Sequence, residues 1–362
     1  MQNLNISLIG FFLSSNGLGQ AARNIAHSLS STSLSHTCIN INHNGAGSDS
    51  EFNEKCSTYL PGQINLVITG IDYTELIAGQ ISSMGVGKNN YFYPYWELDR
   101  IPSKVLNAIS IYDKVIAPSQ FIANTFQKYL DYKVPVIRQP VFIPQHIPVN
   151  RIEGGVLRIF CMMDLGSYVA RKNPKGALAA FLMAFPATIK NVEFIIKIKG
   201  DRDLGLRKEF DVYCSKDTRI RVVDGDLTRE DIIALINKCN VFVSLHRSEG
   251  FGFGPAEAMA SGKIVVATEY GGVTDFLNNF TGYPISYKMT AVKEGEYIYG
   301  DNQMWAEPSV LHAALALQEI YNNFGRAVKR ANNGRQLMMS KFSFKSIGKQ
   351  FQNYFERNQS AL

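Results

Sequence analysis

The residue types and spacing best suited to chemistry fall in one glycine-rich stretch, SEGFGFGPAEAMASG, over residues 248–262. Two carboxylates, Glu249 and Glu257, bracket its glycines with seven residues between them. Glycines lack side chains, so a ligand can approach their backbone closely and reach its N–H groups. The pattern therefore predicts a loop that holds a ligand against the main chain. The alternating glycines of this loop are Gly250, Gly252 and Gly254.

A buried strand over 241–245 is predicted before this loop, and a helix is predicted to begin at Pro255 and stop at Gly262. A helix N-terminus carries partial positive charge, which suits a phosphate or a developing anion. Glu257 would lie in the first helical turn, where its carboxylate could accept both hydroxyls of a ribose. Two alternatives stay open: an acid that compensates the helix dipole, or a dinucleotide fingerprint with Glu269 after the next strand, although the spacing is GxGxG rather than GxGxxG.

A second chemical signal is the pair Arg171 and Lys172, directly before the string NPKGALAAF. A nucleoside diphosphate gains negative charge as it leaves a sugar, and a fixed cation stabilises that charge. A solvated helix start is the alternative interpretation. Cations are unfavourable near a helix N-terminus, however, so the pattern favours a functional role for the pair.

Short β-branched runs alternate with amphipathic stretches, which favours right-handed βαβ units around buried parallel sheets. The proline-rich segment 138–155 separates two such series and has the composition of a linker. We expect an N-terminal domain over residues 1–145, a C-terminal domain over 146–340, and a C-terminal helix over 341–362 that returns to the N-terminal domain. Strands are predicted at 5–10, 37–41, 64–69, 114–117, 134–138, 157–162, 192–198, 220–223, 240–245 and 263–268, and helices at 20–29, 103–110, 119–129 and over most of 309–357.

Length and charge narrow the class of protein. The 362 residues suggest roughly two domains. Hydrophobic residues make up 46% and charged residues 19%, which excludes a disordered chain, a collagen and a coiled coil. The net charge of +6 is too small for a nucleic-acid binder but permits loose contact with an anionic membrane surface.

Targeting and metal signals are weak. The apolar stretch 176–189 is too short to span a membrane and contains Pro186, so a buried helix is predicted there. The N-terminus has no basic residue before Arg23, so we expect no secretory signal and a cytoplasmic protein. Five cysteines form no CxxC pair and six histidines no zinc spacing, which indicates reduced thiols and no zinc site.

Four strings, in this order along the chain, resemble one protein family. They are NGLGQAARNIAHSL (16–29), YPYWELDRIPSKVLNAISIYDKVIAPSQFIANTF (93–126), RKNPKGALAAF (171–181) and SLHRSEGFGFGPAEAMASGKIVVAT (244–268). The last closely resembles the E-x7-E signature of retaining glycosyltransferases of the GT-B fold, family 4 type. The second resembles a block of a bacterial polysaccharide-building branch of that family. The resemblance implies an α/β fold with two Rossmann-like domains that face each other across a cleft.

The resemblance assigns roles to the residues of the C-terminal half. Glu257 would bind the nucleotide ribose, and Glu249, with backbone N–H groups of the loop, would contact the donor sugar. Lys172 would neutralise the donor diphosphate. Many relatives carry an arginine five residues earlier, where this chain has Ser167, so Arg171 or Arg247 would take that role. The donor-binding loop comprises Gly250, Phe251, Gly252, Phe253 and Gly254.

In the N-terminal half, Gly17 and Gly19 would bring backbone N–H groups near the donor phosphates, with an ordinary strand–helix turn as the alternative. Arg23 would assist them or lie on the surface. Glu97 would bind acceptor hydroxyls or move a proton, or else be an acid at the core edge. His246 is expected to position the loop rather than act as a base.

No cofactor or metal is expected, because Lys172 and a helix N-terminus serve the phosphates. The alternative is a divalent ion on one of two aspartate pairs, Asp201 with Asp203 or Asp224 with Asp226. Turn aspartates after strands explain both pairs equally well.

The resemblance implies a glycosyltransferase that moves a sugar from a UDP- or GDP-sugar to a saccharide acceptor carried on a lipid. O-antigen, capsule or related bacterial surface-glycan synthesis would be the setting, with peripheral contact at the inner leaflet of the cytoplasmic membrane. The alternative is a non-catalytic sugar-nucleotide binder with a degenerate GT-B site. An NAD-dependent oxidoreductase is a third class, which nicotinamide absorbance would reveal.

Overall fold

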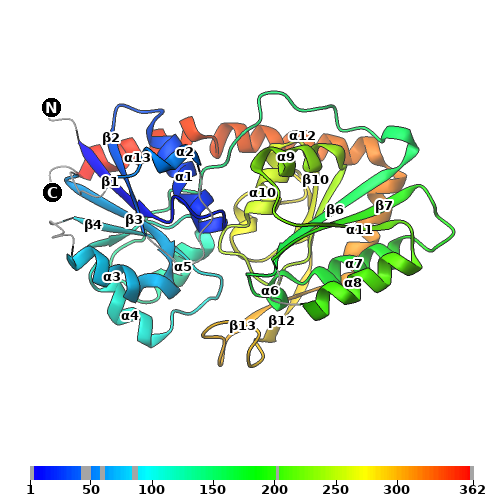
Figure 1. The fold of residues 1–362 in the computed structure, drawn as a ribbon, viewed down its shortest axis with the longest axis horizontal. Helices are drawn as coiled ribbons and strands as arrows, with labels where there is room; N and C mark the ends of the chain where they lie inside the picture. Colours follow the sequence, from blue (N-terminus) through cyan, green and yellow to red (C-terminus); the bar gives the residue numbers. More distant parts are fainter. Residues whose placement is uncertain (1–3, 42–49, 58–61, 84–88, 201–203, 359–362) are drawn as a thin grey trace. The chain divides into compact units, whose positions relative to one another are not determined.

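A computed structural model describes residues 4–41, 50–57, 62–83, 89–200 and 204–358. The chain divides into two compact units. Unit 1 comprises Met1–Phe142 together with Ser340–Leu362, and unit 2 comprises Ile143–Met339 (Figure 1). Each unit is built around its own parallel sheet, so each is described by itself.

The sheet of unit 1 has five parallel strands in the order β2-β1-β3-β4-β5. The order reverses between β1 and β3, and ligands of such sheets bind beyond the carboxyl ends of the strands at that point. The strands are β1 (Asn5–Gly10), β2 (Ser35–Asn40), β3 (Ile64–Gly70), β4 (Asn90–Tyr95) and β5 (Lys114–Val115).

Helices cover both faces of this sheet (Figure 1). They are α1 (Gly17–Leu29), α2 (Ser50–Asn53), η1 (Ile71–Tyr73), α3 (Thr74–Ser83), α4 (Ser103–Ile109), α5 (Gln120–Gln127) and α13 (Phe344–Asn358). The last of these packs against the first: a Cβ added to Gly348 would meet the Ser28 carbonyl oxygen at 2.1 Å. The ring of Phe351 lies 5.8 Å from that of Tyr93 in β4. A segment from the end of the chain thus completes one layer of unit 1.

The sheet of unit 2 has six parallel strands in the order β11-β10-β9-β6-β7-β8. β7 and β8, which follow β6 in the chain, are added on one side of it, and β10 and β11, which follow β9, are added on the other side. The strand order therefore reverses between β6 and β9. The strands are β6 (Leu157–Asp164), β7 (Val192–Lys199), β8 (Ile220–Asp224), β9 (Val241–Ser244), β10 (Ile264–Thr268) and β11 (Tyr283–Ile285).

An antiparallel hairpin, β12 (Tyr287–Ala291) and β13 (Met304–Pro308), follows β11. The helices of unit 2 are η2 (Glu153–Gly155), α6 (Val169–Lys172), α7 (Pro174–Ala184), α8 (Leu204–Lys216), α9 (Arg229–Lys238), α10 (Phe253–Ala260), η3 (Gly271–Asp275), α11 (Val310–Asn322) and α12 (Phe324–Lys341).

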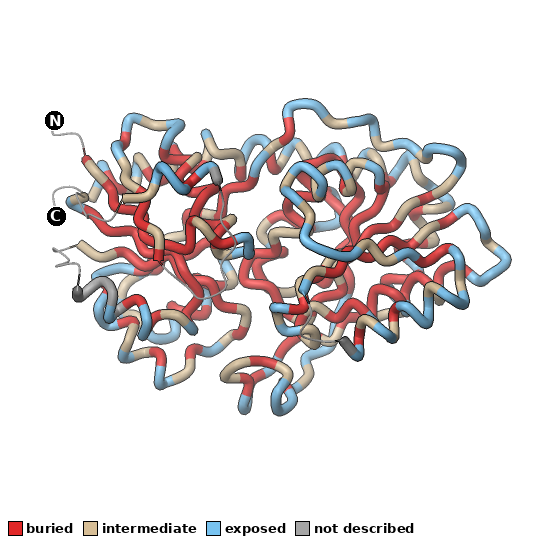
Figure 2. The backbone as a smooth tube through the Cα atoms, in the orientation of Figure 1, coloured by how far each residue is buried: buried red, intermediate tan, exposed pale blue. Residues whose placement is uncertain are grey.

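Buried strands form the centre of each unit, as the tube view shows (Figure 2). In unit 2 the core joins alternate side chains of β6, β7, β9 and β10 to the apolar faces of α7 and α11. Continuous β-branched runs are expected where both faces of a parallel sheet are covered by helices.

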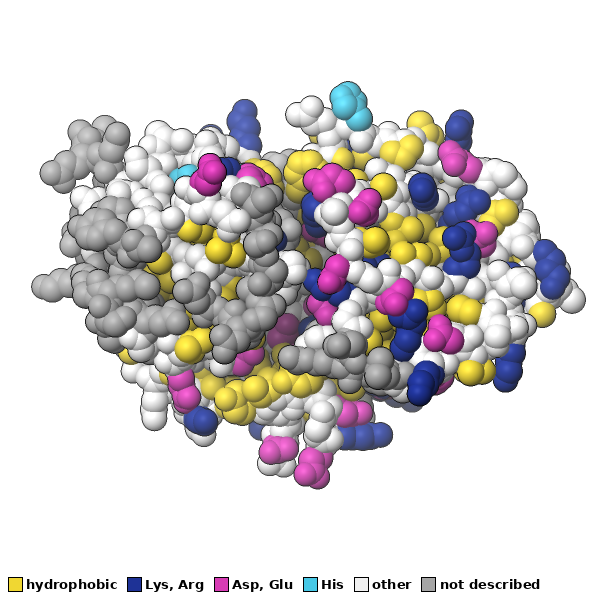
Figure 3. Space-filling view, in the orientation of Figure 1, with side chains coloured by type: hydrophobic (Ala, Val, Ile, Leu, Met, Phe, Trp, Pro, Cys, Tyr) yellow, Lys and Arg dark blue, Asp and Glu magenta, His cyan; other side chains and the backbone are white. Residues whose placement is uncertain are grey.

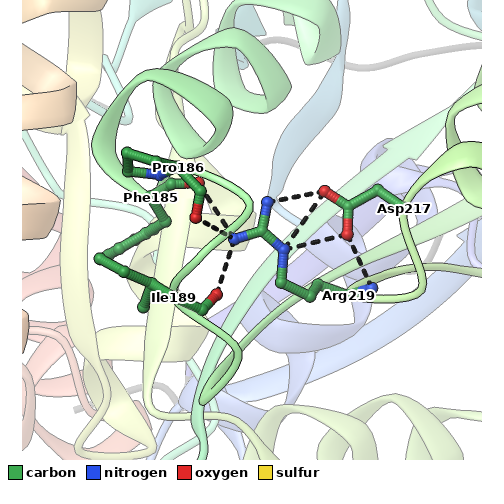
Figure 4. A network of polar contacts seen from close by, with 5 residues as sticks. All are labelled: Phe185, Pro186, Ile189, Asp217 and Arg219. Atoms are coloured by element: carbon green, nitrogen blue, oxygen red, sulfur yellow. Dashed lines mark hydrogen bonds and ion pairs between the residues drawn. The ribbon is translucent and has the colours of Figure 1, made fainter.

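Arg219 fastens the edge of this sheet where β7 and β8 begin (Figure 4). Its Nη1 donates to the carbonyl oxygens of Phe185, Pro186 and Ile189 at 3.0, 3.0 and 2.8 Å, and its Nη2 donates to Asp217 at 2.7 Å. The buried guanidinium thereby satisfies carbonyls that follow α7, where a cation is favourable. This edge lies opposite the carboxyl ends, where ligands bind.

The structure confirms most predicted elements, reduces one predicted strand to a bridge, and adds elements that were not predicted, β4 among them. Residues 134–138 form only a single bridge, Ala117 with Val136, because Pro135 cannot donate to a ladder. β4 was not predicted, since its sequence NYFYPY is aromatic and contains proline rather than β-branched residues. The predicted cap of α5 is confirmed: the Ser119 side chain accepts from the Ile122 N–H at 3.2 Å.

Candidate active site

The candidate site of unit 2 lies where the strand order reverses. The segment after β6 carries α6, and the segment after β9 carries the glycine loop, so both leave carboxyl ends of adjacent strands. This is the position at which sheets of this kind bind dinucleotides. The fold thus brings together the two chemical signals that the sequence shows 77 positions apart.

Glu249 is the centre of the cluster. Its Oε1 lies 2.5 Å from Lys172 Nζ and its Oε2 lies 3.1 Å from Arg171 Nη1. Glu249 and Arg171 are each only 6% exposed, whereas the Lys172 side chain is 28% exposed. With Glu249 at −1 and the two cations at +2, the cluster carries a net charge of +1, and Lys172 is its solvent-facing member.

Two opposing effects set the pKa of Glu249. Burial alone would raise it, but the charges of Lys172 and Arg171 outweigh burial and lower the pKa to about 2. His246 is fully buried, and burial lowers its pKa to about 4. The carboxylate is therefore ionised and the imidazole neutral at pH 7.

The cations end a helix rather than begin one, which corrects the sequence-based placement. α6 stops at Lys172, and Asn173 follows in the left-handed conformation at φ 48°. The Asn173 side chain then caps α7, accepting from the Gly176 N–H at 3.2 Å, and donates to the Leu245 carbonyl oxygen at 2.9 Å. Asn173 therefore ties α6 to the end of β9, and the string N-P before a helix is the sequence signal for such a cap.

Arg171 is not a solvated residue. Its Nη1 donates to the Ser248 carbonyl oxygen at 3.0 Å and its Nη2 donates to Ser167 Oγ at 3.0 Å. Arg171 therefore holds the glycine loop in place from beneath, and Ser167 is one of its partners.

Arg247, like Arg171, forms hydrogen bonds to other groups of unit 2. Its Nη1 donates to the Ala170 carbonyl oxygen at 2.6 Å and its Nε donates to Glu307 at 2.6 Å. Its own N–H donates to the Arg171 carbonyl oxygen at 2.7 Å. Arg247 thus fastens α6, and its guanidinium is already occupied by protein groups.

The helix after the loop begins two residues earlier than predicted. α10 starts at Phe253, with Gly252 at its N-cap and φ of 93°. Pro255 is its third residue, a position where a missing N–H costs nothing because the first four have no partner within the helix. Gly262 follows the helix at φ 69°, as predicted. A Cβ on Gly272 would meet the Gly250 carbonyl oxygen at 2.1 Å, so the backbones of two glycine segments meet there.

Aromatic packing fixes the rest of this loop. Phe251 is buried, and its ring lies 5.3 Å from that of Phe253 and 5.6 Å from that of Phe276. Gly254 lies over the sheet, where a Cβ would meet Phe242 and Met162 at 2.9 and 3.1 Å. The loop is therefore a rigid part of the unit.

Glu257 is buried in the second turn of α10 and not in the first. Its Oε1 lies 2.6 Å from Arg229 Nη1, at the start of α9. An acid that compensates the helix dipole belongs in the first turn, so the placement weakens that alternative.

His246 lies beneath the loop. Its Nδ1 is 3.1 Å from Ser244 Oγ and its Nε2 is 3.2 Å from the Tyr270 carbonyl oxygen. Both ring nitrogens face protein groups, so the geometry suits a positioning residue, as predicted.

In unit 1, the predicted glycines differ in environment. The Gly19 N–H donates to Asn16 Oδ1 at 2.9 Å, and a Cβ there would meet the Ser14 carbonyl oxygen at 2.0 Å. Around Gly17 a Cβ would meet nothing within 4 Å. The loop thus has its present shape only because Gly19 lacks a side chain. Arg23 is buried, and its Nη1 donates to the carbonyl oxygens of Phe12 and Ser14, so it braces the same loop from within.

Glu97 follows β4, beside Trp96. Trp96 Nε1 donates to the Arg100 carbonyl oxygen at 2.8 Å, which holds the turn on which the half-buried carboxylate sits. Glu97 and the loop after β1 both lie at carboxyl ends of the sheet of unit 1.

The aspartate pairs have other partners. Asp224 pairs with Arg207, and Asp226 lies 3.4 Å from Lys199. Asp201 and Asp203 lie outside the described residues. Within the described part of the chain, no three His, Cys, Asp or Glu side chains are grouped to hold a metal ion, and the five cysteines are free thiols.

The hairpin after β11 supplies residues that the sequence did not indicate. Tyr297, from its loop, lies with its ring 5.8 Å from the Arg171 guanidinium, and Trp305 lies 5.7 Å from that of Arg247. Tyr297 thus contacts α6 directly, whereas Trp305 and Glu307 contact Arg247, which bonds to α6. No local pattern marks them, because their partners lie far away along the chain.

Residues 162–289 match the family described as glycosyl transferases group 1. This segment is therefore similar to the group 1 glycosyl transferases. It contains both site segments, α6 and the glycine loop with α10, and it ends before β13.

Three known proteins are similar to this chain in sequence or in fold. An uncharacterized glycosyltransferase of Methanocaldococcus jannaschii, MJ1178, is 26% identical over 190 residues, which are 52% of this chain and 46% of that protein. The chain therefore spans about half the length of that relative. Sucrose-phosphate synthase from Thermosynechococcus elongatus has a TM-score of 0.72 at 14% identity, over 99% of this chain and 100% of that one. Anabaena HepE in complex with UDP-glucose has a TM-score of 0.68 at 15% identity, over 99% and 100%. The likeness confirms the predicted GT-B fold class.

Surface charge and helix length add two observations. On the face drawn in Figure 3, basic side chains over unit 2 are interspersed with acidic ones rather than gathered in one patch. No helix within the described ranges combines the length and apolarity needed to cross a lipid bilayer.

Proposed function

We propose that the chain is a retaining glycosyltransferase that moves a sugar from a nucleoside-diphosphate sugar to a saccharide acceptor. One observation carries the proposal: Arg171, Lys172 and Glu249 form a net-positive cluster at the strand-order reversal of unit 2. A site with one surplus positive charge beside the start of α10 suits a diphosphate.

The chemistry needs a group that stabilises the departing nucleoside diphosphate. The Lys172 ammonium has three N–H donors, and Glu249 takes one of them. The remaining donors can meet the phosphates, as can N–H groups at the first turn of α10. Glu257 would accept the ribose hydroxyls, with Arg229 fixing its carboxylate from the other side.

The ion pairs of Glu249 bear on the mechanism. Each of its carboxylate oxygens faces a cation, which makes the group a poor nucleophile. We therefore assign it contact with the donor sugar, together with loop residues such as Phe251 and Gly252. The departing phosphate would deprotonate the acceptor hydroxyl on the same face of the sugar, which retains the configuration.

We assign the two substrates to different units. Unit 2 would bind the donor, and unit 1 would bind the acceptor near Glu97 and offer the backbone N–H of Gly17 to the phosphates. The UDP-glucose in complex with HepE supports a UDP-sugar as donor, and a GDP-sugar fits the same groups. The string 93–126 supports a lipid-linked acceptor in bacterial surface-glycan synthesis, with loose contact at the inner leaflet of the cytoplasmic membrane.

The test combines binding and turnover. A thermal-shift panel of UDP- and GDP-sugars identifies the donor, because a ligand at about 100 times its Kd stabilises the fold by about 2.7 kcal/mol. The donor is then incubated with lipid-linked saccharide acceptors, and the anomeric configuration of the product is read by NMR. Product with the donor's configuration supports the proposal. A donor that binds with no transfer to any acceptor would indicate a non-catalytic binder, and an inverted product would overturn the retaining mechanism.

A further inference from the structure

The β12–β13 hairpin packs one of its faces onto the candidate site. Antiparallel pairing puts Trp305 and Glu307 on the same face of the hairpin. Trp305 is completely buried, as is Ala306 on the opposite face, whereas Met289 and Met304 on that opposite face are exposed. An isolated two-stranded hairpin is marginally stable in water, so this contact is also what holds the hairpin in place.

The hairpin acts on α6 through Arg247. Glu307 accepts from Arg247 Nε at 2.6 Å, and the Ala306 N–H donates to the Arg247 carbonyl oxygen at 2.9 Å. On its other side Arg247 holds the carbonyl oxygens of Ala170 and Arg171. A continuous chain of hydrogen bonds thus runs from β13 through Arg247 to the helix that carries Lys172.

α6 depends on such contacts for its shape. It has four residues, too few for an isolated helix to persist in water. A second contact comes from Tyr297, whose ring packs 4.6 Å from that of Tyr168 at the start of α6 and lies below the Arg171 guanidinium. The hairpin therefore holds α6 at both ends.

The exposure of the pair indicates what Glu307 contributes. The Glu307 side chain is 43% exposed, so its ion pair with Arg247 contributes little stability of its own. Its short hydrogen bond to Nε fixes the direction of the guanidinium instead. Without Glu307, the Ala170 carbonyl oxygen and the ring of Trp305 would be left to orient the guanidinium, so its hold on α6 would loosen.

We propose that the β12–β13 hairpin, through Glu307 and Tyr297, positions α6 so that the Lys172 ammonium faces the diphosphate of the donor. This inference rests on the proposed function, because it names the element that sets the geometry of the same site. β13 lies beyond residue 289, where the group 1 family match ends, so this support belongs to the chain outside the matched segment. Glu307 and Tyr297 are positioning residues and touch no substrate.

The first measurement needs no ligand. Glu307→Ala removes the oxygen that accepts from Arg247 Nε, and Glu294→Ala is the matched control, an exposed carboxylate in the loop of the same hairpin. Each protein is treated with an amine-acylating reagent, and the labelling of Lys172 is followed by mass spectrometry with Lys175 as internal reference. We expect Lys172 to react several-fold faster in Glu307→Ala and at the parent rate in Glu294→Ala. An unchanged Lys172 rate in Glu307→Ala would overturn the proposal.

The second measurement is calorimetric binding of UDP or GDP and of the matching nucleoside. We expect Glu307→Ala to weaken diphosphate binding about 10-fold with unchanged nucleoside binding, and to add no loss in an Arg247→Ala background, where the chain of contacts is already broken. Parallel loss of diphosphate and nucleoside binding, or additive losses, would show mere structural support and overturn the positioning role. If the parent binds neither diphosphate while Lys172 labelling still responds, the proposed function fails and the positioning role stands.

Discussion

Lys172 and Glu249 lie 77 positions apart, yet 2.5 Å separates Nζ of the first from Oε1 of the second. The contact joins the end of α6 to the loop before α10, so it couples the two segments that carry the chemistry of unit 2. Removing either residue therefore leaves the charge of the other without this partner. A variant at one position affects ligand binding partly through the residue that remains.

Glu249 should make unit 2 sensitive to acid. Its pKa in the folded protein is about 2, below the ordinary value of 4.5, so its ion pairs stabilise the fold fully above about pH 5 and lose that effect as pH falls toward 2. We expect the difference in free energy of unfolding between the parent and Glu249→Gln to shrink by about 2 kcal/mol from pH 5 to pH 3. Urea unfolding, followed by Trp305 fluorescence in a Trp96→Phe background, measures it. Parallel pH profiles would contradict the assignment.

Lys172→Ala should separate phosphate recognition from nucleoside recognition. Loss of a charged hydrogen bond costs about 1.5–3 kcal/mol, so we expect nucleoside diphosphate binding to weaken by about 10- to 150-fold. Nucleoside affinity should stay unchanged, as should both affinities in the control Lys175→Ala, a lysine of α7 paired with Glu209. Calorimetry with both ligands decides it, and equal losses for nucleoside and diphosphate would mean that Lys172 faces another group.

Glu257→Gln should remove discrimination between ribose and deoxyribose. The substitution keeps the shape but turns one acceptor oxygen into a donor, so two ribose hydroxyls can no longer both find acceptors. We expect ribonucleotide affinity to fall about 10-fold and deoxyribonucleotide affinity to change little. Glu230→Gln, an exposed carboxylate on α9, is the control for loss of charge alone. A variant that still prefers ribose as strongly as the parent would refute the ribose contact.

The two glycines of α1 should respond oppositely to alanine. A Cβ at Gly19 would meet the Ser14 carbonyl oxygen at 2.0 Å, so Gly19→Ala should destabilise unit 1 by about 1–3 kcal/mol. Gly17 has open space, so Gly17→Ala should leave the free energy of unfolding unchanged or raise it by less than about 1 kcal/mol. Trp96 fluorescence in a Trp305→Phe background follows unit 1. Weaker donor binding in the stable Gly17→Ala would support its place near the phosphates, and unchanged binding would count against it.

The sequence predicted those parts of the fold whose patterns are local. β1 and β7 are short runs rich in isoleucine, leucine and valine, and their bounds match the prediction within one residue. The sequence analysis did not predict β4, because aromatic residues and Pro94 replace that pattern there. The hairpin was not predicted either, because its strands are stabilised by the contact of Trp305 with Arg247. These two residues are 58 positions apart, so no local pattern records the contact.

The same limit applies to the candidate site. Glycine spacing and the flanking carboxylates located the loop at 249–257, and the pair of cations marked residues 171 and 172, although not that they end the short helix α6. Spacing could not show that Arg171 and Lys172 share Glu249, since that follows from the adjacency of β6 and β9. The resemblance offered Arg247, with Arg171, as a replacement for the diphosphate arginine of relatives, but it could not show the hydrogen bond of Arg247 to Glu307, 60 positions further on.

The discontinuity of unit 1 has a consequence for biosynthesis. α13 packs on α1 and β4, yet a ribosome makes it only after the whole of unit 2. At roughly 5–20 residues per second, the interval is about 10–40 s. Unit 2 is contiguous and can close during that time, whereas the apolar surface of unit 1 that receives Phe351 stays uncovered. Unit 1 is therefore the first to be synthesised but the last to complete its fold, which reverses the usual order of co-translational folding.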